Sequence, residues 1–206
     1  MVGKKFAVGD KVKYITLIKA AVGMFYAQDA EMLLRKVDGR SACERCVVNC
    51  IARYLWCLIQ QRGLRADVDV EYNLDCKSED PKRIGLETCR YCSRSECLMH
   101  AFVKGRIRCR ESRKVMRSNP LIYPDLIVHV RGPSRNYLAV ELKKEDEARK
   151  RTGNYKNAAM WDMAKLQYLS CRERMTGVSP YDEKVFVILK PNEAEFILPE
   201  QFPAAE

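Results

Sequence analysis

Three charged residues stand in two short apolar segments of the chain, Asp125 at the start of "DLIVHV" and Glu141 and Lys143 in "YLAVELK". The intervening "RGPSRN" contains Gly and Pro and predicts a turn, so the two segments are expected to form a β-hairpin. Side chains alternate between the two faces of a strand, so Glu141 and Lys143 share one face of the second strand. Asp125 likewise places acid on only one face of the first strand. If the two faces coincide, two carboxylates and an ammonium converge in a pocket suited to a hard divalent cation. The alternative is three solvent-facing charges on a half-exposed sheet.

The composition is that of a globular protein. The 206 residues are 47% apolar and 31% charged, which predicts one domain with room for an insertion and excludes disorder and collagen. No run approaches the roughly 18 apolar residues of a membrane span, and "MVGKKFAVGDKVKY" lacks the apolar core of a signal peptide. We therefore expect no membrane partner and a cytoplasmic location, in the host cell if the chain is viral.

The charge balance favours a polyanionic partner. Thirty-seven basic residues against 27 acidic ones give a net charge of +10, which favours nucleic acid over acidic proteins or membrane surfaces. The alternative is a solvated basic face with no ligand. The oligomeric state stays open, with a homodimer among the alternatives.

Helices are predicted at the start of the chain and again near its end. Residues 14–37 have helix-forming content that Gly23 interrupts, giving one broken helix or two short ones. A second helix, over 42–63, is predicted to be capped by Ser41 and ended by Gly63. A later helix is predicted over 157–175.

Three further strand signals complete the expected order of elements. Val68 and Val70 alternate with acidic residues within 65–75, "KVFVILKP" is typical of a buried strand, and "AEFILP" is a short final one. The order is helix, three strands, helix, strand. We expect a single domain over 1–206, with a helical extension over about 1–40 and a Cys-rich insertion over about 76–110.

This order, with Pro124-Asp125 and Glu141-Leu142-Lys143, resembles the PD-(D/E)XK nuclease superfamily over roughly residues 41–190. The segments "DVEYN", "PDLIVHVRG" and "NYLAVELKK" are also similar to small uncharacterised bacterial members. The resemblance implies an α/β fold with an αβββαβ restriction-endonuclease-like core and a mixed central sheet. It also implies catalytic roles for Asp125, Glu141 and Lys143, and for Glu44 in the opening helix, although Glu44 equally suits the dipole of a helix N-terminus.

The implied function is Mg²⁺- or Mn²⁺-dependent hydrolysis of DNA phosphodiester bonds. Asp125, Glu141 and the carbonyl of Leu142 would hold the metal, which polarises the phosphate and lowers the pKa of bound water. Lys143 would orient or deprotonate the water and offset the developing charge. Two alternatives remain, a catalytically inactive nucleic-acid-binding protein on the same fold and a metal-stabilised interaction module.

Other residues are weaker candidates. His129 shares the face of Asp125, but a lone His is more commonly a core or hydrogen-bonding residue. Lys165, near Asp162 and Gln167 on the later helix, is a candidate phosphate contact, with a solvated helix face as the alternative. Basic residues of the insertion are further candidate nucleic-acid contacts, among them Arg106, Arg108 and Arg110.

Ten cysteines are unusual in a reducing compartment and suggest metal or buried thiols. Within the insertion, spacing predicts a structural Zn²⁺ site whose ligands are Cys89, Cys92, Cys97 and His100, with Cys76 or Cys109 as replacements for His100. An iron–sulfur cluster, disulfides or free thiols are the alternatives. On the second helix, Cys43 and Cys50 are predicted to be small buried hydrophobes, and Cys43-x2-Cys46 is a weaker metal candidate.

Overall fold

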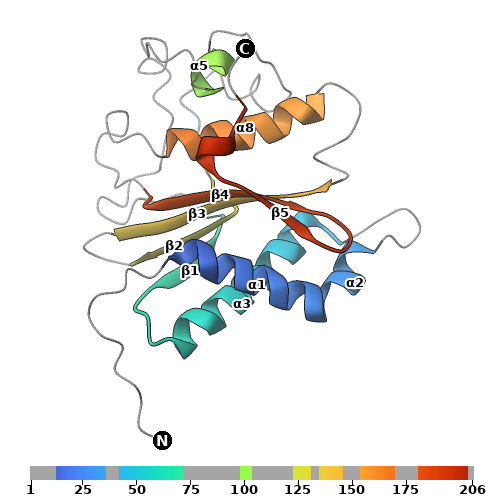
Figure 1. The fold of residues 1–206 in the computed structure, drawn as a ribbon, viewed down its shortest axis with the longest axis vertical. Helices are drawn as coiled ribbons and strands as arrows, with labels where there is room; N and C mark the ends of the chain where they lie inside the picture. Colours follow the sequence, from blue (N-terminus) through green and yellow to red (C-terminus); the bar gives the residue numbers. More distant parts are fainter. Residues whose placement is uncertain are drawn as a thin grey trace, which may run out of the picture.

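The protein is an α/β fold in which helices cover both faces of a five-stranded sheet (Figure 1). This computed structural model describes seven segments, residues 13–35, 42–71, 98–103, 123–130, 135–145, 154–169 and 181–203. On one face lie α1 (Tyr14–Gln28), α2 (Ala30–Leu34) and α3 (Glu44–Gln61). On the other lies α8 (Asn154–Tyr168), which the short α5 (Leu98–Val103) covers in turn.

The sheet is mixed and open. Its order is β1 (Asp67–Val70), β2 (Leu126–Val130), β3 (Arg135–Lys144), β4 (Glu183–Leu189) and β5 (Ala194–Ile197). All neighbours are antiparallel except β3 and β4, which run parallel and are joined through α8. A parallel pair needs such a crossover, which explains why a helix separates these strands in the sequence. The predicted succession of helix, three strands, helix and strand is confirmed, with β5 as the short final strand.

The first helical region breaks at Asp29 instead of Gly23, so the predicted interruption at Gly23 is wrong. Gly23 lies on the exposed side of α1, where a helix tolerates glycine at a cost of only about 1 kcal/mol. At the break, the Asp29 carboxylate accepts hydrogen bonds from Tyr54 and from the Cys50 thiol of α3. The junction between α1 and α2 is thus tied to α3 by side chains far away in sequence.

Helix α3 is amphipathic as predicted, although its start differs. Cys43 is the N-cap residue, two positions after the predicted Ser41, and its side chain makes no capping hydrogen bond. The helix ends at Gln61 with Arg62 as its C-cap, and the predicted stop residue Gly63 comes next. The φ of Gly63 is 63°, a left-handed conformation that glycine adopts without strain. The buried side chains of α3 include Val47, Val48, Ile51, Leu55 and Ile59.

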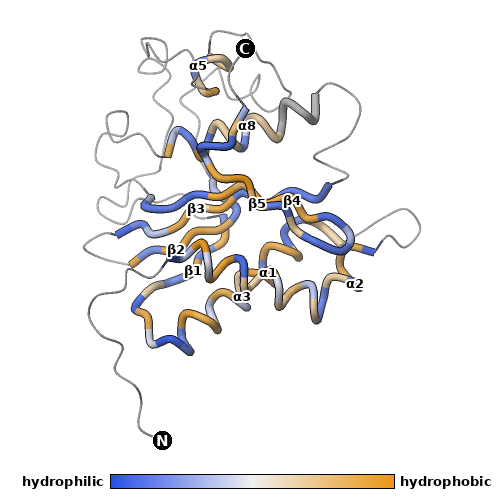
Figure 2. Tube along the Cα trace, in the orientation of Figure 1, coloured by the Kyte–Doolittle hydropathy of each residue, from blue (hydrophilic) through white to orange (hydrophobic). Residues whose placement is uncertain are grey.

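Because side chains alternate along each strand, each face of the sheet has its own hydrophobic core. Leu126 and Val128 of β2, with Leu138, Val140 and Leu142 of β3, pack on the α1 and α3 side. Ile127 and Ala139 are register partners and pack instead against α8. The central parts of the strands are strongly hydrophobic (Figure 2). The predicted alternation is therefore confirmed, and it places Glu141 and Lys143 on the face of Ala139.

Helix α8 begins at Asn154, three residues before the predicted start, and residues 170–175 of the prediction lie outside the described segments. α5 packs on it through a hydrogen bond from the Leu98 N–H to Gln167 Oε1, 2.9 Å long, and through the rings of Phe102 and Trp161. None of the helices in the described segments combines the length and apolar character needed to cross a bilayer.

A buried carboxylate–lysine cluster as the candidate functional site

The predicted hairpin brings Asp125 to the residues of β3. Asp125 directly precedes β2, and its Oδ2 accepts a hydrogen bond of 2.7 Å from the backbone N–H of Leu142. That N–H lies between Glu141 and Lys143, so the Asp125 carboxylate is held beside both. The convergence of these three residues, which strand periodicity suggested, is present in the structure.

Glu44 joins this group from α3. Lys143 Nζ donates a hydrogen bond of 2.9 Å to Glu44 Oε1, and the next lysine, Lys144, donates one of 3.0 Å to the carbonyl of Ala42. The end of β3 is therefore fastened to the first turn of α3. Glu44 has a specific partner, so the helix dipole alone does not account for its position.

Helix α8 supplies two further charges. Asp162 lies 3.4 Å from Lys143 Nζ through Oδ2 and 2.8 Å from Lys165 Nζ through Oδ1. Lys165 Nζ in turn lies 2.8 Å from Glu141 Oε1. The side chain of Lys165 is 14% exposed, so it does not lie on a solvated helix face. A continuous chain of opposite charges results, formed by Glu44, Lys143, Asp162, Lys165 and Glu141. Together with the adjacent Asp125, these residues are here named the carboxylate–lysine cluster.

Glu141 is the least satisfied member. Its side chain is fully buried, and neither carboxylate oxygen accepts a hydrogen bond within the described segments. Lys165 Nζ is close enough for ion pairing but lies outside hydrogen-bond geometry. Burial raises the pKa of Glu141 well above its usual value of 4.5, and the attraction of Lys165 only partly offsets this.

The carboxyl groups of Asp125 and Asp162 differ from each other in the direction of their pKa shifts. Burial raises the pKa of Asp125, although Lys143 and Lys165 act in the opposite direction. Asp162 is also buried, but its two lysine partners outweigh desolvation and lower its pKa. The cluster therefore contains one well-paired carboxylate on α8 and two poorly compensated ones on the hairpin.

Both lysines are ammonium ions at neutral pH. Burial alone would lower the pKa of Lys143, but the surrounding carboxylates, Asp162 foremost, outweigh burial and raise it. The same balance raises the pKa of Lys165. Lys143 thus has the character of a fixed positive charge and hydrogen-bond donor, which fits charge stabilisation better than proton abstraction.

The carboxylate oxygens of these residues are suited to binding a hard cation. Four carboxyl groups face two ammonium groups, and the two buried oxygens of Glu141 accept no hydrogen bond from any residue in the described ranges. Oxygen ligands of this kind are what Mg²⁺ and Mn²⁺ take in proteins. Within the described segments, however, no three His, Cys, Asp or Glu residues are arranged as a ready metal-binding group. Asp125 and Glu141 are the two side chains that would hold the ion.

His129 and Gln167 have structural partners. His129 is fully buried, and its Nε2 lies 2.7 Å from Asp69 Oδ2 across the β1–β2 pair. The Gln167 side chain joins α5 to α8. The arrangement of His129 fits its interpretation as a core or hydrogen-bonding residue.

Most of the predicted zinc and phosphate contacts lie outside the described segments, namely Cys89, Cys92, Cys97, Arg106, Arg108 and Arg110. His100 is described and is half-buried in α5. The zinc site and these contacts stay predictions. The predicted burial of Cys43 is wrong because this residue precedes the first turn of α3 and is exposed, while Cys50 is half-buried.

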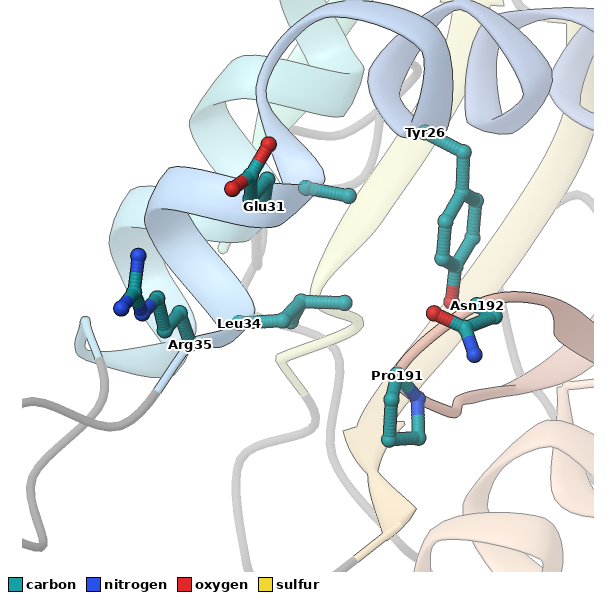
Figure 3. Close-up of a pocket in the computed structure, with 7 residues that line it drawn as sticks. Tyr26, Glu31, Leu34, Arg35, Pro191 and Asn192 are labelled. Atoms are coloured by element: carbon teal, nitrogen blue, oxygen red, sulfur yellow. The ribbon is translucent and has the colours of Figure 1, made fainter.

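A separate pocket of about 500 Å³ lies between the α1–α2 region and the turn after β4 (Figure 3). Tyr26, Leu34, Pro191 and Asn192 are among its lining residues. None of the lining residues belongs to the carboxylate–lysine cluster. The pocket and the charged cluster are therefore distinct features.

The sequence singled out four of the cluster residues for catalysis and a fifth, Lys165, for phosphate contact, but it gave Asp162 no role. The signal that could have identified Asp162 was its position three residues before Lys165 among the buried residues of α8, where a charged side chain needs a partner.

Comparison with protein-family models, with curated proteins and with solved structures found no match to this chain.

Proposed function

We propose that the protein is a Mg²⁺- or Mn²⁺-dependent nuclease that hydrolyses DNA phosphodiester bonds, on a restriction-endonuclease-like form of the α/β fold. One observation carries the proposal: Glu141 is a fully buried carboxylate that accepts no hydrogen bond from the residues that the structure describes, and it lies on the same side of the sheet as Asp125 and Lys143. A buried carboxylate that accepts no hydrogen bond costs stability even beside the Lys165 ammonium, and a bound cation would reduce that cost. The net charge of +10 supports a polyanionic substrate.

The roles of the side chains follow from their positions. Asp125 and Glu141 would hold the metal, which, when bound, supplies Lewis-acid activation of the phosphate and of water. Lys143 presents its ammonium beside these carboxylates and stabilises the negative charge that develops on the phosphate oxygens. Glu44 and Asp162 orient Lys143 from two directions, through contacts of 2.9 Å and 3.4 Å.

A second candidate is an inactive nucleic-acid-binding protein on the same fold. The observation that favours it is the contact of 2.8 Å between Lys165 and Glu141, because this ammonium already supplies positive charge to the candidate metal ligand. In a degenerate site, such a lysine replaces the cation permanently. In an active site, Asp162, the other partner of Lys165 at 2.8 Å, would hold this ammonium and leave Glu141 to the metal.

The test separates metal ligands from the lysine. Asp125→Asn and Glu141→Gln remove charge from the metal site, so titration calorimetry with Mn²⁺ should show weaker binding and cleavage should fall. Lys143→Ala keeps both carboxylates, so metal affinity should be retained, while cleavage falls on the order of 10²–10³-fold. Single-stranded, double-stranded and branched DNA, with RNA alongside, form the substrate panel.

Lys190→Ala is the matched control. Lys190 also pairs with two glutamates, Glu193 and Glu195 of the β4–β5 hairpin, and neither belongs to the cluster. This variant should cleave at the wild-type rate. If Lys143→Ala also does so while folded, Lys143 is a structural charge. Salt-dependent DNA binding with no cleavage in any divalent metal would establish the inactive alternative.

A further inference from the structure

Two thiols lie next to each other at the start of α3. Cys43 and Cys46 are both exposed, and their sulfur atoms are 3.0 Å apart. Cys43 is the N-cap residue with an extended backbone, and the N–H of Cys46 donates a hydrogen bond of 3.0 Å to its carbonyl. This turn brings both side chains to the same side of the helix start.

The spacing is suited to disulfide formation. A disulfide has an S–S distance of about 2.05 Å, so the two sulfur atoms need to approach by roughly 1 Å. Exposed side chains on a first helical turn can make that adjustment by rotation about χ1, with no displacement of the packed residues Val47 and Val48. The pair is therefore preorganised for closure.

We propose that Cys43 and Cys46 form a reactive dithiol that exchanges with external disulfides and closes to an intramolecular disulfide. The Cys43 thiolate attacks one sulfur of a disulfide R–S–S–R, forming a mixed disulfide and releasing RS⁻. The Cys46 thiolate then attacks Cys43 Sγ and releases the second RS⁻. The protein loses two electrons and two protons, and the external disulfide becomes two thiols. This proposal does not depend on the proposed nuclease activity.

The two sulfur atoms differ in a way that assigns the steps. The hydrogen bond from Cys46 is the main cause that lowers the pKa of Cys43, and the positive charge of Lys144 acts in the same direction. The same contact raises the pKa of Cys46, which leaves it as the resolving thiol. A low-pKa, exposed thiol followed by a resolving partner is the arrangement that exchange requires.

Cys50, one turn further along α3, provides an internal contrast. It is half-buried and donates a hydrogen bond of 2.9 Å to Asp29 Oδ2. Burial first, and then the carboxylate of Asp29, raise its pKa to about 11. Its thiolate at neutral pH is far scarcer than that of Cys43, so exchange should occur at Cys43 and not at Cys50.

A metal site built on the same pair is less well supported. Two thiolates make half of the tetrahedral set that zinc requires. In the parts of the chain that the structure describes, no third Cys, His, Asp or Glu completes a metal-binding group with them. The dithiol needs no further residue, which is why we favour it over a metal centre.

The test uses the full chain, reduced and then incubated with glutathione disulfide. After an acid quench and alkylation with N-ethylmaleimide, trypsin cleaves after Arg40, Arg45 and Arg53, so Cys43 and Cys46 fall in separate peptides, "SACER" and "CVVNCIAR". We expect these two peptides to be joined after oxidation and separated by dithiothreitol. In the reduced protein, Cys43 should alkylate at least about tenfold faster than Cys50, after allowance for the lower nucleophilicity of a low-pKa thiolate.

Three variants make the outcome unambiguous. Cys46→Ser should trap the glutathione adduct on Cys43, because the resolving thiol is gone. Cys50→Ser should leave the joined peptides unchanged, which shows that the bridge in "CVVNCIAR" is to Cys46. Cys43→Ser should abolish the joined product. The proposal is overturned if both thiols stay alkylatable under oxidation, if either bridges to another cysteine instead, or if the purified protein carries a metal ion whose removal alone exposes them.

Discussion

Leu142 and Glu141 are neighbours in β3 and equally buried, with exposed fractions of 1% and 0%, yet they lie on opposite faces of the sheet. Leu142 packs with the apolar side chains of α1 and α3, where burial stabilises the fold at about 25 cal/mol per Å². Glu141 lies on the α8 face, where no group in the described part of the chain donates a hydrogen bond to its carboxylate. Burial of Leu142 therefore stabilises the fold, while burial of Glu141 carries a cost in stability at the place where a ligand would be bound.

The largest expected effect is on the apolar face. Leu142→Ala should lower the free energy of unfolding by about 2–5 kcal/mol, since it removes buried methyl groups and leaves a cavity against α1 and α3. Urea denaturation followed by circular dichroism measures this. The backbone N–H that binds Asp125 is retained, so the folded variant should keep its Mn²⁺ affinity. A loss below about 1 kcal/mol would mean that this face is not closely packed.

The next effect is on the charged face and depends on pH. The folded pKa of Glu141 is raised above 4.5, so below pH 4.5 the group is protonated in both states. Above that value the unfolded chain releases the proton while the folded protein keeps it. The metal-free wild type then loses about 1.4 kcal/mol per pH unit until the folded pKa is passed. Glu141→Gln lacks this loss, so its stability relative to wild type should rise with pH above 4.5.

Asp162→Asn is the control of opposite sign. The folded pKa of Asp162 is lowered below 3.8, so its contribution to stability is present above pH 3.8 and is lost as the pH falls through the folded value. This variant should therefore be less stable than wild type at neutral pH, and the difference should shrink in acid. Unfolding curves of both variants between pH 3 and pH 8, with metal removed by chelation, should diverge in these opposite directions. Parallel curves would mean that neither carboxyl group is perturbed by folding.

The apolar face was predictable from the sequence, and the charged face only in part. Strand periodicity placed Leu142 and Glu141 on opposite faces, because a period of two leaves no freedom once pairing is fixed. It also brought Asp125 beside Lys143. Lys165 was harder to place, because a pattern of charge on a helix does not tell a solvated face from an internal ion pair.

Local boundaries and distant contacts set the remaining limits. The break at Asp29 depends on hydrogen bonds from Cys50 and Tyr54, which no local signal at Gly23 could anticipate. The exposure of Cys43 follows from where α3 begins, and helix ends are the least certain part of any pattern. Residue periodicity was therefore enough to predict which face of an element is buried. The side-chain contacts between helices that fix the break at Asp29 were not predictable in this way.

The smallest effect on stability is expected at Glu44, where the two faces meet. The Glu44–Lys143 pair is about a quarter exposed, so Glu44→Gln should change the free energy of unfolding by less than about 1 kcal/mol. Lys143 keeps Asp162 at 3.4 Å but loses the negative charge of its nearest partner, so cleavage should fall on the order of tenfold with metal affinity unchanged. Glu44→Asp decides between two explanations. It keeps a negative charge at the start of α3, so a role limited to the helix dipole predicts wild-type stability and wild-type cleavage together. A role in positioning Lys143 depends on reach as well as charge, so we expect this variant to keep its stability and still cleave slowly; full cleavage by Glu44→Asp would show that Glu44 serves the helix alone.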